Sequence, residues 1–163
     1  MRKMSCCEQE GKGASSFRYI LLVFLLISFL SAQDHSCSAA TGILWKGYRE
    51  GLAQAGREGK PAIIIFYSES CSTCKQYKSV LQDKRIVQAS AAFVMIRVDT
   101  RQEPQLSAKY QFDGWYVPRT FAVFPDGRIM QQLYPRKKYR YFIGLEPENL
   151  LRLMQNALAE ITH

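Results

Sequence analysis

Ala62-Ile63-Ile64-Ile65-Phe66-Tyr67 is followed, after three residues, by Cys71-Ser72-Thr73-Cys74. The first segment is continuously apolar, which is typical of a strand buried on both faces. The pattern then becomes that of a helix that begins near Cys71 and runs through Leu81. A buried strand thus delivers Cys71 to the positive end of a helix, which favours a thiolate. This stretch predicts thiol–disulfide exchange chemistry at a strand-to-helix junction.

The regions on either side of this stretch predict an α/β fold. Leu44, Tyr48, Leu52 and Ala55 recur at helical spacing, and Gly59-Lys60-Pro61 ends that helix. Phe93–Val98 is a second buried strand, and a strand-helix-strand order requires a crossover and parallel pairing. The sequence therefore predicts a parallel pair of central strands.

The C-terminal part completes the sheet. Glu103–Tyr110 predicts a short helix, and Pro125-Asp126-Gly127 predicts the turn of a hairpin between Thr120–Phe124 and Arg128–Leu133. A last helix begins near Pro147, and its apolar side chains can cover one face of the sheet. The predicted fold class is a central mixed β-sheet flanked by helices on both faces.

The N-terminus differs from the rest of the chain. Basic residues precede the apolar block Tyr19–Leu30, which is shorter than the roughly 20 residues of a membrane-spanning helix. This is the pattern of a signal peptide over residues 1–32, with an uncleaved membrane anchor as the alternative. Residues 33–42 are expected to form a flexible linker and 43–161 the folded domain. Cys37 is expected to be an unpaired thiol in this linker or to pair with another chain.

The charge of the chain gives little support to nucleic-acid binding. The formal net charge is +8, and without residues 1–32 there remain 18 basic and 12 acidic residues, a charge of +6. The one dense basic cluster lies in Arg136–Tyr141, and no recognisable nucleic-acid-binding module accompanies it. We therefore expect no nucleic-acid partner and interpret this cluster as a solvated loop or strand edge.

Several segments together resemble the thioredoxin superfamily, and more narrowly the anterior gradient-type two-cysteine proteins and similar bacterial periplasmic proteins. They are Gly51–Ala55 with Gly59-Lys60-Pro61, Cys71–Lys75, Phe93–Met95, Gly114–Arg119, Pro125–Gly127 and Tyr139–Phe142. The resemblance covers about residues 43–161. It implies a thioredoxin-like fold and disulfide exchange with other proteins.

The resemblance also implies the roles of individual residues. Cys71 matches the family's nucleophile and Cys74 its resolving cysteine. Pro118 matches the family's cis-proline, which with Val117 offers backbone groups to a substrate peptide. The hydroxyls of Ser72 and Thr73 are expected to lie beside the thiolate and the substrate. The Cys71–Cys74 pair is then the redox group, and we expect no further cofactor and no metal.

This sequence departs from the family pattern in ways that affect the chemistry. Ser72-Thr73 replaces Gly-Pro between the cysteines, and Ser70 stands where reducing thioredoxins commonly carry Trp. Ile65 replaces the buried Asp of the family, and Met95 is taken as the replacement for a nearby strand lysine. Deprotonation of Cys74 then depends on water, Glu69 or another group.

These observations predict an exported thiol–disulfide oxidoreductase, of reductase or isomerase type. Its expected partners are exported proteins with cysteines and a redox partner that recycles the disulfide, in a periplasm or, alternatively, a secretory lumen. A membrane is a further partner if the N-terminal segment is retained. The alternative function is a non-catalytic client-binding module or chaperone that uses the groove beside Pro118.

Overall fold

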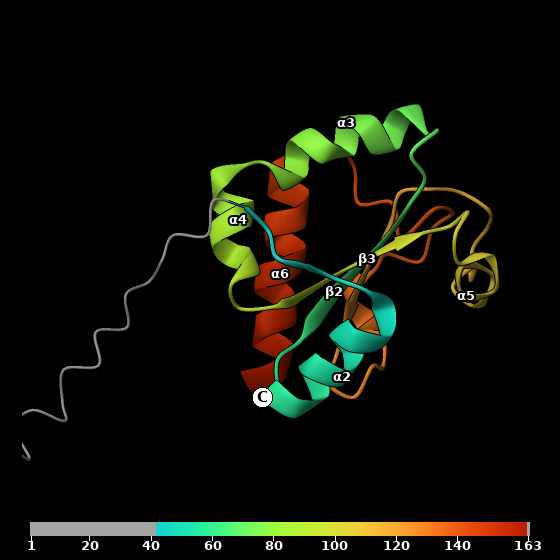
Figure 1. Cartoon of the computed structure of the whole chain (residues 1–163). Coiled ribbons are helices and arrows are strands. Elements are labelled where there is room, and N and C mark those ends of the chain that lie inside the picture. Colours follow the sequence, from blue (N-terminus) through green and yellow to red (C-terminus); the bar gives the residue numbers. More distant parts are fainter. Residues whose placement is uncertain (1–41, 163) are drawn as a thin grey trace, which may run out of the picture. The chain divides into compact units, whose positions relative to one another are not determined.

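The computed structural model describes residues 42–162. The predicted signal peptide, Cys37 and all of the predicted linker except Gly42 lie outside these residues. In the described part, the sheet has four strands in the order β1-β3-β2-β4 (Figure 1): β1 (Trp45–Lys46), β2 (Ala62–Tyr67), β3 (Val94–Asp99) and β4 (Arg119–Val123). Strand β3 pairs in parallel with β1 and β2, whereas β4 pairs antiparallel with β2. The predicted mixed sheet is therefore confirmed.

The helices lie on both faces of this sheet (Figure 1). Helix α2 (Tyr48–Glu58) packs on β2 and β3, and α6 (Pro147–Thr162) packs on β4 and on α4 (Lys84–Ser90). Helix α3 (Ser72–Leu81) follows β2, and α5 (Pro104–Lys109) connects the end of β3 to the segment before β4. This arrangement confirms the predicted fold class.

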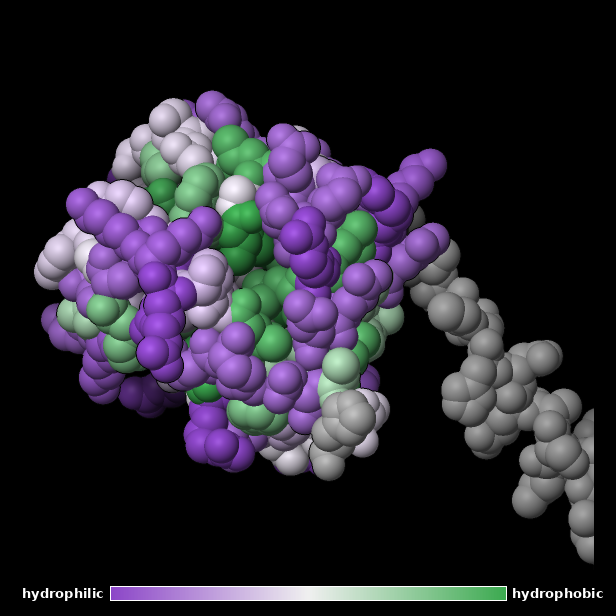
Figure 2. Space-filling model, turned by 180° about the vertical axis from the view of Figure 1, so that it is seen from behind, coloured by the Kyte–Doolittle hydropathy of each residue, from purple (hydrophilic) through white to green (hydrophobic). Residues whose placement is uncertain are grey.

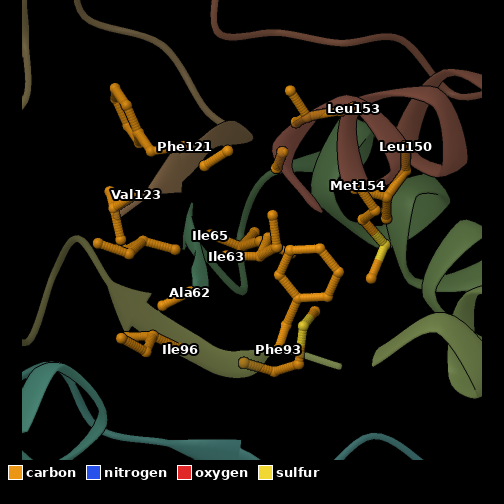
Figure 3. Packing of buried hydrophobic residues seen from close by; sticks show 14 of the residues in the cluster. Ala62, Ile63, Ile65, Phe93, Ile96, Phe121, Val123, Leu150, Leu153 and Met154 are labelled. Atoms are coloured by element: carbon orange, nitrogen blue, oxygen red, sulfur yellow. The ribbon is translucent and has the colours of Figure 1, made fainter. Parts of the chain in front are cut away.

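Alternation along the strands divides the core between the two faces. Figure 3 shows Ile63, Ile65 and Phe93 beside Leu150 and Met154 of α6. These five residues are all buried. Burial on both sides explains why β2 is apolar throughout. On the outside, hydrophilic residues cover most of the face drawn in Figure 2, with hydrophobic residues gathered in a band between them.

One sequence prediction is wrong near the N-terminus of the domain, and one helix further along the chain was not predicted. Leu44 does not belong to the first helix, because the chain forms β1 at Trp45–Lys46 before α2 begins at Tyr48, and the Leu44 side chain is 76% exposed. Helix α4 was not predicted. It has only seven residues, and it begins where the Asp83 carboxylate accepts a hydrogen bond from the Arg85 N–H at 2.8 Å.

The predicted hairpin is also wrong in its second strand. Arg128–Leu133 forms one β-bridge, between Val123 and Ile129, and then a 3-10 turn, η2 (Gln131–Leu133). Within residues 42–162, backbone pairing of this segment is limited to the Phe124 N–H donating to the Arg128 carbonyl and the Met130 N–H donating to the Ala122 carbonyl. The N–H groups of β4 are satisfied in another way, because that of Ala122 donates to the Tyr134 hydroxyl at 2.6 Å and that of Thr120 to the Tyr141 carbonyl at 2.8 Å. Side-chain and loop contacts replace a strand there.

Candidate active site

Cys71 occupies the N-cap position of α3. The turn after β2 ends with the Cys71 N–H donating to the Ser68 carbonyl, and the helix begins at Ser72. The Cys74 N–H donates to the Cys71 sulfur at 3.3 Å, so the sulfur satisfies one of the free N–H groups at the helix end. The predicted strand-to-helix junction is confirmed, and the helix end points at the first sulfur.

The two thiols differ strongly in acidity. Burial raises the pKa of Cys71, but hydrogen bonds from the side chain and N–H of Cys74 and from Thr73 outweigh burial, so its pKa is lowered. Burial raises the pKa of Cys74 to about 12, and the neighbouring charges of Cys71 and Glu69 act in the same direction. Cys71 is half-buried and Cys74 is buried. The accessible sulfur is therefore the one that ionises first.

The segment before β4 lies against this thiol. The Val117–Pro118 peptide bond is cis, as the resemblance implies. The Cys71 Sγ donates to the Val117 carbonyl oxygen at 3.5 Å, across 46 positions of sequence. The fold thus brings Cys71, Cys74, Val117 and Pro118 together, whereas their roles in binding a substrate remain predictions.

The two hydroxyls between the cysteines differ in position. Thr73 is half-buried, and both its N–H and its hydroxyl stabilise the Cys71 thiolate. Ser72 is exposed, and within residues 42–162 no hydrogen bond joins its hydroxyl to either sulfur. Thr73 therefore contributes to the lowered pKa of Cys71, and a role of either hydroxyl in binding a substrate stays a prediction.

The interior behind Cys74 is apolar at the position of the family's buried carboxylate. Ile65 is 2% exposed and pairs in register with Arg97 on β3 and Thr120 on β4. The β3 residue directly opposite Ile65 is therefore Arg97, whereas Met95 pairs with Ile63 and is buried; that Met95 replaces the family's lysine stays a prediction. Arg97 is exposed, with its guanidinium over the rings of Trp45 and Tyr67.

Glu69 does not replace the missing carboxylate in the interior. It is exposed and forms an ion pair with Lys78 at 2.9 Å. The buried polar contact on this face of the sheet is instead between the hydroxyls of Tyr77 and Thr120, at 3.1 Å. Neither group is a carboxylate that could accept the proton of Cys74.

Sequence reasoning missed Arg119, which follows the cis-proline directly. Its side chain is 1% exposed and lies over the ring of Phe66. The guanidinium donates to the Tyr110 carbonyl at 3.1 Å and to the Ser107 hydroxyl at 2.7 Å, at the C-terminal end of α5. Burial lowers its pKa. The available signal in the sequence was an arginine at the first position of a buried strand.

Hydrogen bonds of Tyr116 also fix the segment that precedes Pro118. The Tyr116 hydroxyl donates to the Asp113 carboxylate at 2.9 Å and accepts from the Tyr141 N–H at 3.1 Å. Tyr116 therefore joins two loops, whereas the neighbouring Trp115 is 83% exposed. Trp115 is therefore an exposed aromatic residue two positions before Val117.

Within residues 42–162, no group of three or more His, Cys, Asp or Glu side chains is placed to hold a metal ion. No helix there is long and apolar enough to cross a membrane.

Comparisons with known protein sequences identify similar proteins. A family model described as thioredoxin-like matches residues 44–125. Anterior gradient protein 3 of Xenopus tropicalis is 29% identical over 112 residues, covering 67% of this chain and 65% of that protein, slightly less than two thirds of its length. Anterior gradient protein 1 of the same species is 32% identical over 111 residues, covering 62% of this chain and 55% of that protein.

Solved structures share the fold at lower identity. A thioredoxin from Thermus thermophilus has a TM-score of 0.56 and 21% identity, covering 73% of this chain and 89% of its own. DsbH oxidoreductase has a TM-score of 0.55 and 21% identity, covering 78% and 92%. The family model matches half of the chain, and the fold is that of these structures. The chain therefore belongs to the thioredoxin-like family.

Proposed function

We propose that this protein is a thiol–disulfide oxidoreductase that exchanges disulfides of other proteins at Cys71. One observation carries the proposal: Cys71 caps α3 with its sulfur, has a lowered pKa and lies 3.5 Å from the Val117 carbonyl. A stabilised thiolate is the form that attacks a disulfide. The carbonyl beside it can pair with the backbone of an extended substrate.

Exchange proceeds in two displacement steps. The Cys71 thiolate attacks one sulfur of the substrate disulfide, forming a mixed disulfide and releasing the second substrate sulfur as a thiolate. Cys74 then loses its proton and attacks the Cys71 sulfur, which forms the Cys71–Cys74 disulfide and releases the other substrate sulfur. The substrate gains two electrons and the cysteine pair loses them; in the oxidising direction the same steps run in reverse.

The proton of Cys74 limits the reducing direction. Burial and the charge of the free Cys71 thiolate raise the pKa of Cys74 to about 12, and Ile65 supplies no carboxylate to accept the proton. Once Cys71 is in the mixed disulfide, its charge is gone and no longer raises the pKa of Cys74. Cys74 then loses its proton more easily. We propose solvent water as the proton acceptor, because Glu69 is exposed and paired with Lys78.

The cellular setting is part of the same proposal. The apolar block Tyr19–Leu30 supports export, and we propose exported cysteine-containing proteins as substrates. A separate redox partner recycles the Cys71–Cys74 pair. A periplasm or a secretory lumen would supply both.

Two serine variants test the proposal. Cys71→Ser is expected to abolish reduction of insulin disulfides, because the attacking sulfur is gone. Cys74→Ser is expected to retain the first step and accumulate a mixed disulfide that dithiothreitol releases, seen by non-reducing electrophoresis and mass spectrometry. Insulin reduction by Cys71→Ser at the wild-type rate would contradict the proposal.

A second candidate function is client binding without chemistry, and the 83% exposure of Trp115 beside Val117 favours it. A Cys71→Ser/Cys74→Ser variant should then suppress aggregation of an unfolded client as well as wild type does, whereas Trp115→Ala should not. If the cysteine variant loses this activity, binding depends on the disulfide chemistry.

A further inference from the structure

A cavity of about 260 Å³ lies between α6 and the segment Leu133–Ile143. Three cationic side chains line it, Lys137, Arg140 and Arg152, together with the amides of Asn149 and Asn156. Neither cysteine of the candidate active site and neither Val117 nor Pro118 is part of its lining. We propose that this cavity binds a phosphate or sulfate group, free or carried by a small organic molecule.

The arrangement on α6 directs polar groups to one place. Asn149, Arg152 and Asn156 follow one another at intervals of three and four residues, so they share one face of the helix. Opposite this face, the loop before α6 contributes Lys137 and Arg140. Two elements thus present donors to a common space.

The three cationic side chains of the cavity form no ion pair in the described part of the protein. The ion pairs there use Lys46, Lys60, Lys78, Arg85 and Arg128, and none of the three cavity cations. No carboxylate is among the described residues that line the cavity. Like charges in a concave surface repel one another, so an anion that enters removes an existing cost.

Arg140 supplies a further observation. Its Nε is buried and, within residues 42–162, has no hydrogen-bond acceptor. Its guanidinium stacks over the ring of Tyr141 with 4.8 Å to the ring centroid, and its backbone N–H donates to the Asp113 carboxylate at 2.6 Å. The ring of Tyr141 therefore holds the guanidinium in place, and no ion pair neutralises its charge within residues 42–162.

The donor set selects the chemical class of the ligand. Arginine, lysine and the amide groups of asparagine offer many N–H donors, and arginine matches the paired oxygens of phosphate or sulfate. The volume exceeds what one such ion needs, and Tyr134, Phe142 and Ile143 add an apolar wall. A small phosphorylated or sulfated molecule fits this combination.

Calorimetric titration of the full chain with inorganic phosphate, at an ionic strength held constant with chloride, tests the proposal. We expect saturable binding with one site per chain. Arg140→Gln and Arg152→Gln should each weaken it about tenfold, the usual effect of removing one charge-assisted hydrogen bond. Arg57→Gln is the matched control, because it removes the same charge from exposed Arg57 on α2 and should leave affinity unchanged.

Lys137→Gln gives a second, exposed substitution that leaves the packing of Arg140 intact, and it should weaken binding several-fold. A parallel titration with glycerol 3-phosphate distinguishes the two sources: tighter binding than phosphate indicates that the group is carried on an organic molecule, and equal binding indicates the free ion. The proposal is overturned if phosphate binds no better than chloride, or if Arg57→Gln weakens binding as much as the cavity variants. Insulin reduction by the cavity variants stays at the wild-type rate.

Discussion

At the start of α3 the sulfur of Cys71 occupies the place where helices usually carry the side-chain oxygen of Ser, Thr, Asp or Asn. The same atom is the candidate nucleophile, so the hydrogen bonds that stabilise the helix end also stabilise the thiolate. The sulfur of Cys74, one turn away, does not cap the helix, and Cys74 is buried. This difference assigns the order of the two sulfurs in the proposed reaction.

The contribution of Thr73 can be measured by alkylation with iodoacetamide as a function of pH. A lowered pKa means that Cys71 is thiolate at pH values where a free thiol is still protonated, so its alkylation rate should reach half-maximum at a lower pH than that of a free cysteine. Thr73→Val removes a hydrogen bond to the thiolate and should move this midpoint upward and slow alkylation several-fold at pH 6. Ser72→Ala, at the exposed hydroxyl, should leave the profile unchanged; an equal change in both variants would contradict the assignment.

Arg119 is expected to be a large contributor to stability. Arg119→Met leaves the Tyr110 carbonyl and the Ser107 hydroxyl without their donor and should cost about 2–4 kcal/mol of unfolding free energy, measured with urea. Arg119→Lys should recover only part of this loss, because one ammonium cannot reproduce the planar fork. Exposed Arg101→Met is the control, and a similar loss there would refute the role of the buried contacts.

Among the elements, α2 shows how closely a helix and the sheet must approach. A Cβ atom added at Gly51 would collide with the side chain of Ile96 on β3, whereas one added at Gly56 on the same helix would meet only the Pro125 carbonyl, at 3.4 Å. The first glycine is required for packing. The second merely lowers the helix propensity of α2.

Alanine substitutions separate these two glycines. Gly51→Ala should destabilise the domain by about 1–3 kcal/mol, because α2 or Ile96 must move. Gly56→Ala should be neutral or stabilise by up to about 1 kcal/mol through helix propensity. Urea denaturation of both proteins gives the comparison, and equal effects would show that Gly51 is not limited by contact with the sheet.

At the level of the entire domain, two buried tyrosines, Tyr77 and Tyr134, pack against strand β4. Tyr77 contacts the Thr120 hydroxyl and Tyr134 accepts from the Ala122 N–H. Burial raises the pKa of both phenols well above the ordinary value, because a phenolate would lose its hydration. These hydroxyls link β4 to α3 and to the segment after η2.

This burial predicts a loss of stability at alkaline pH. Above about pH 10 the tyrosines of the unfolded chain release protons while those of the folded state do not, so unfolding becomes more favourable as pH rises. Two such groups give a slope of up to about 2–3 kcal/mol per pH unit. Urea midpoints between pH 8 and 11 measure it; Tyr77→Phe and Tyr134→Phe should each make the slope shallower, and midpoints that stay constant up to pH 11 would contradict the prediction.

The sequence by itself determined the central strands, helix α3 and the positions of Cys71 and Cys74, because continuous apolar runs and helical spacing are local signals. The resemblance added the cis bond at Pro118, which the structure contains. Only the tertiary structure decided that Tyr134 and Tyr141 accept the N–H groups of β4, that Arg97 lies opposite Ile65, and that Arg119 is buried. The reason is physical: strand register, edge pairing and burial depend on contacts between residues far apart in the chain, which no local pattern records.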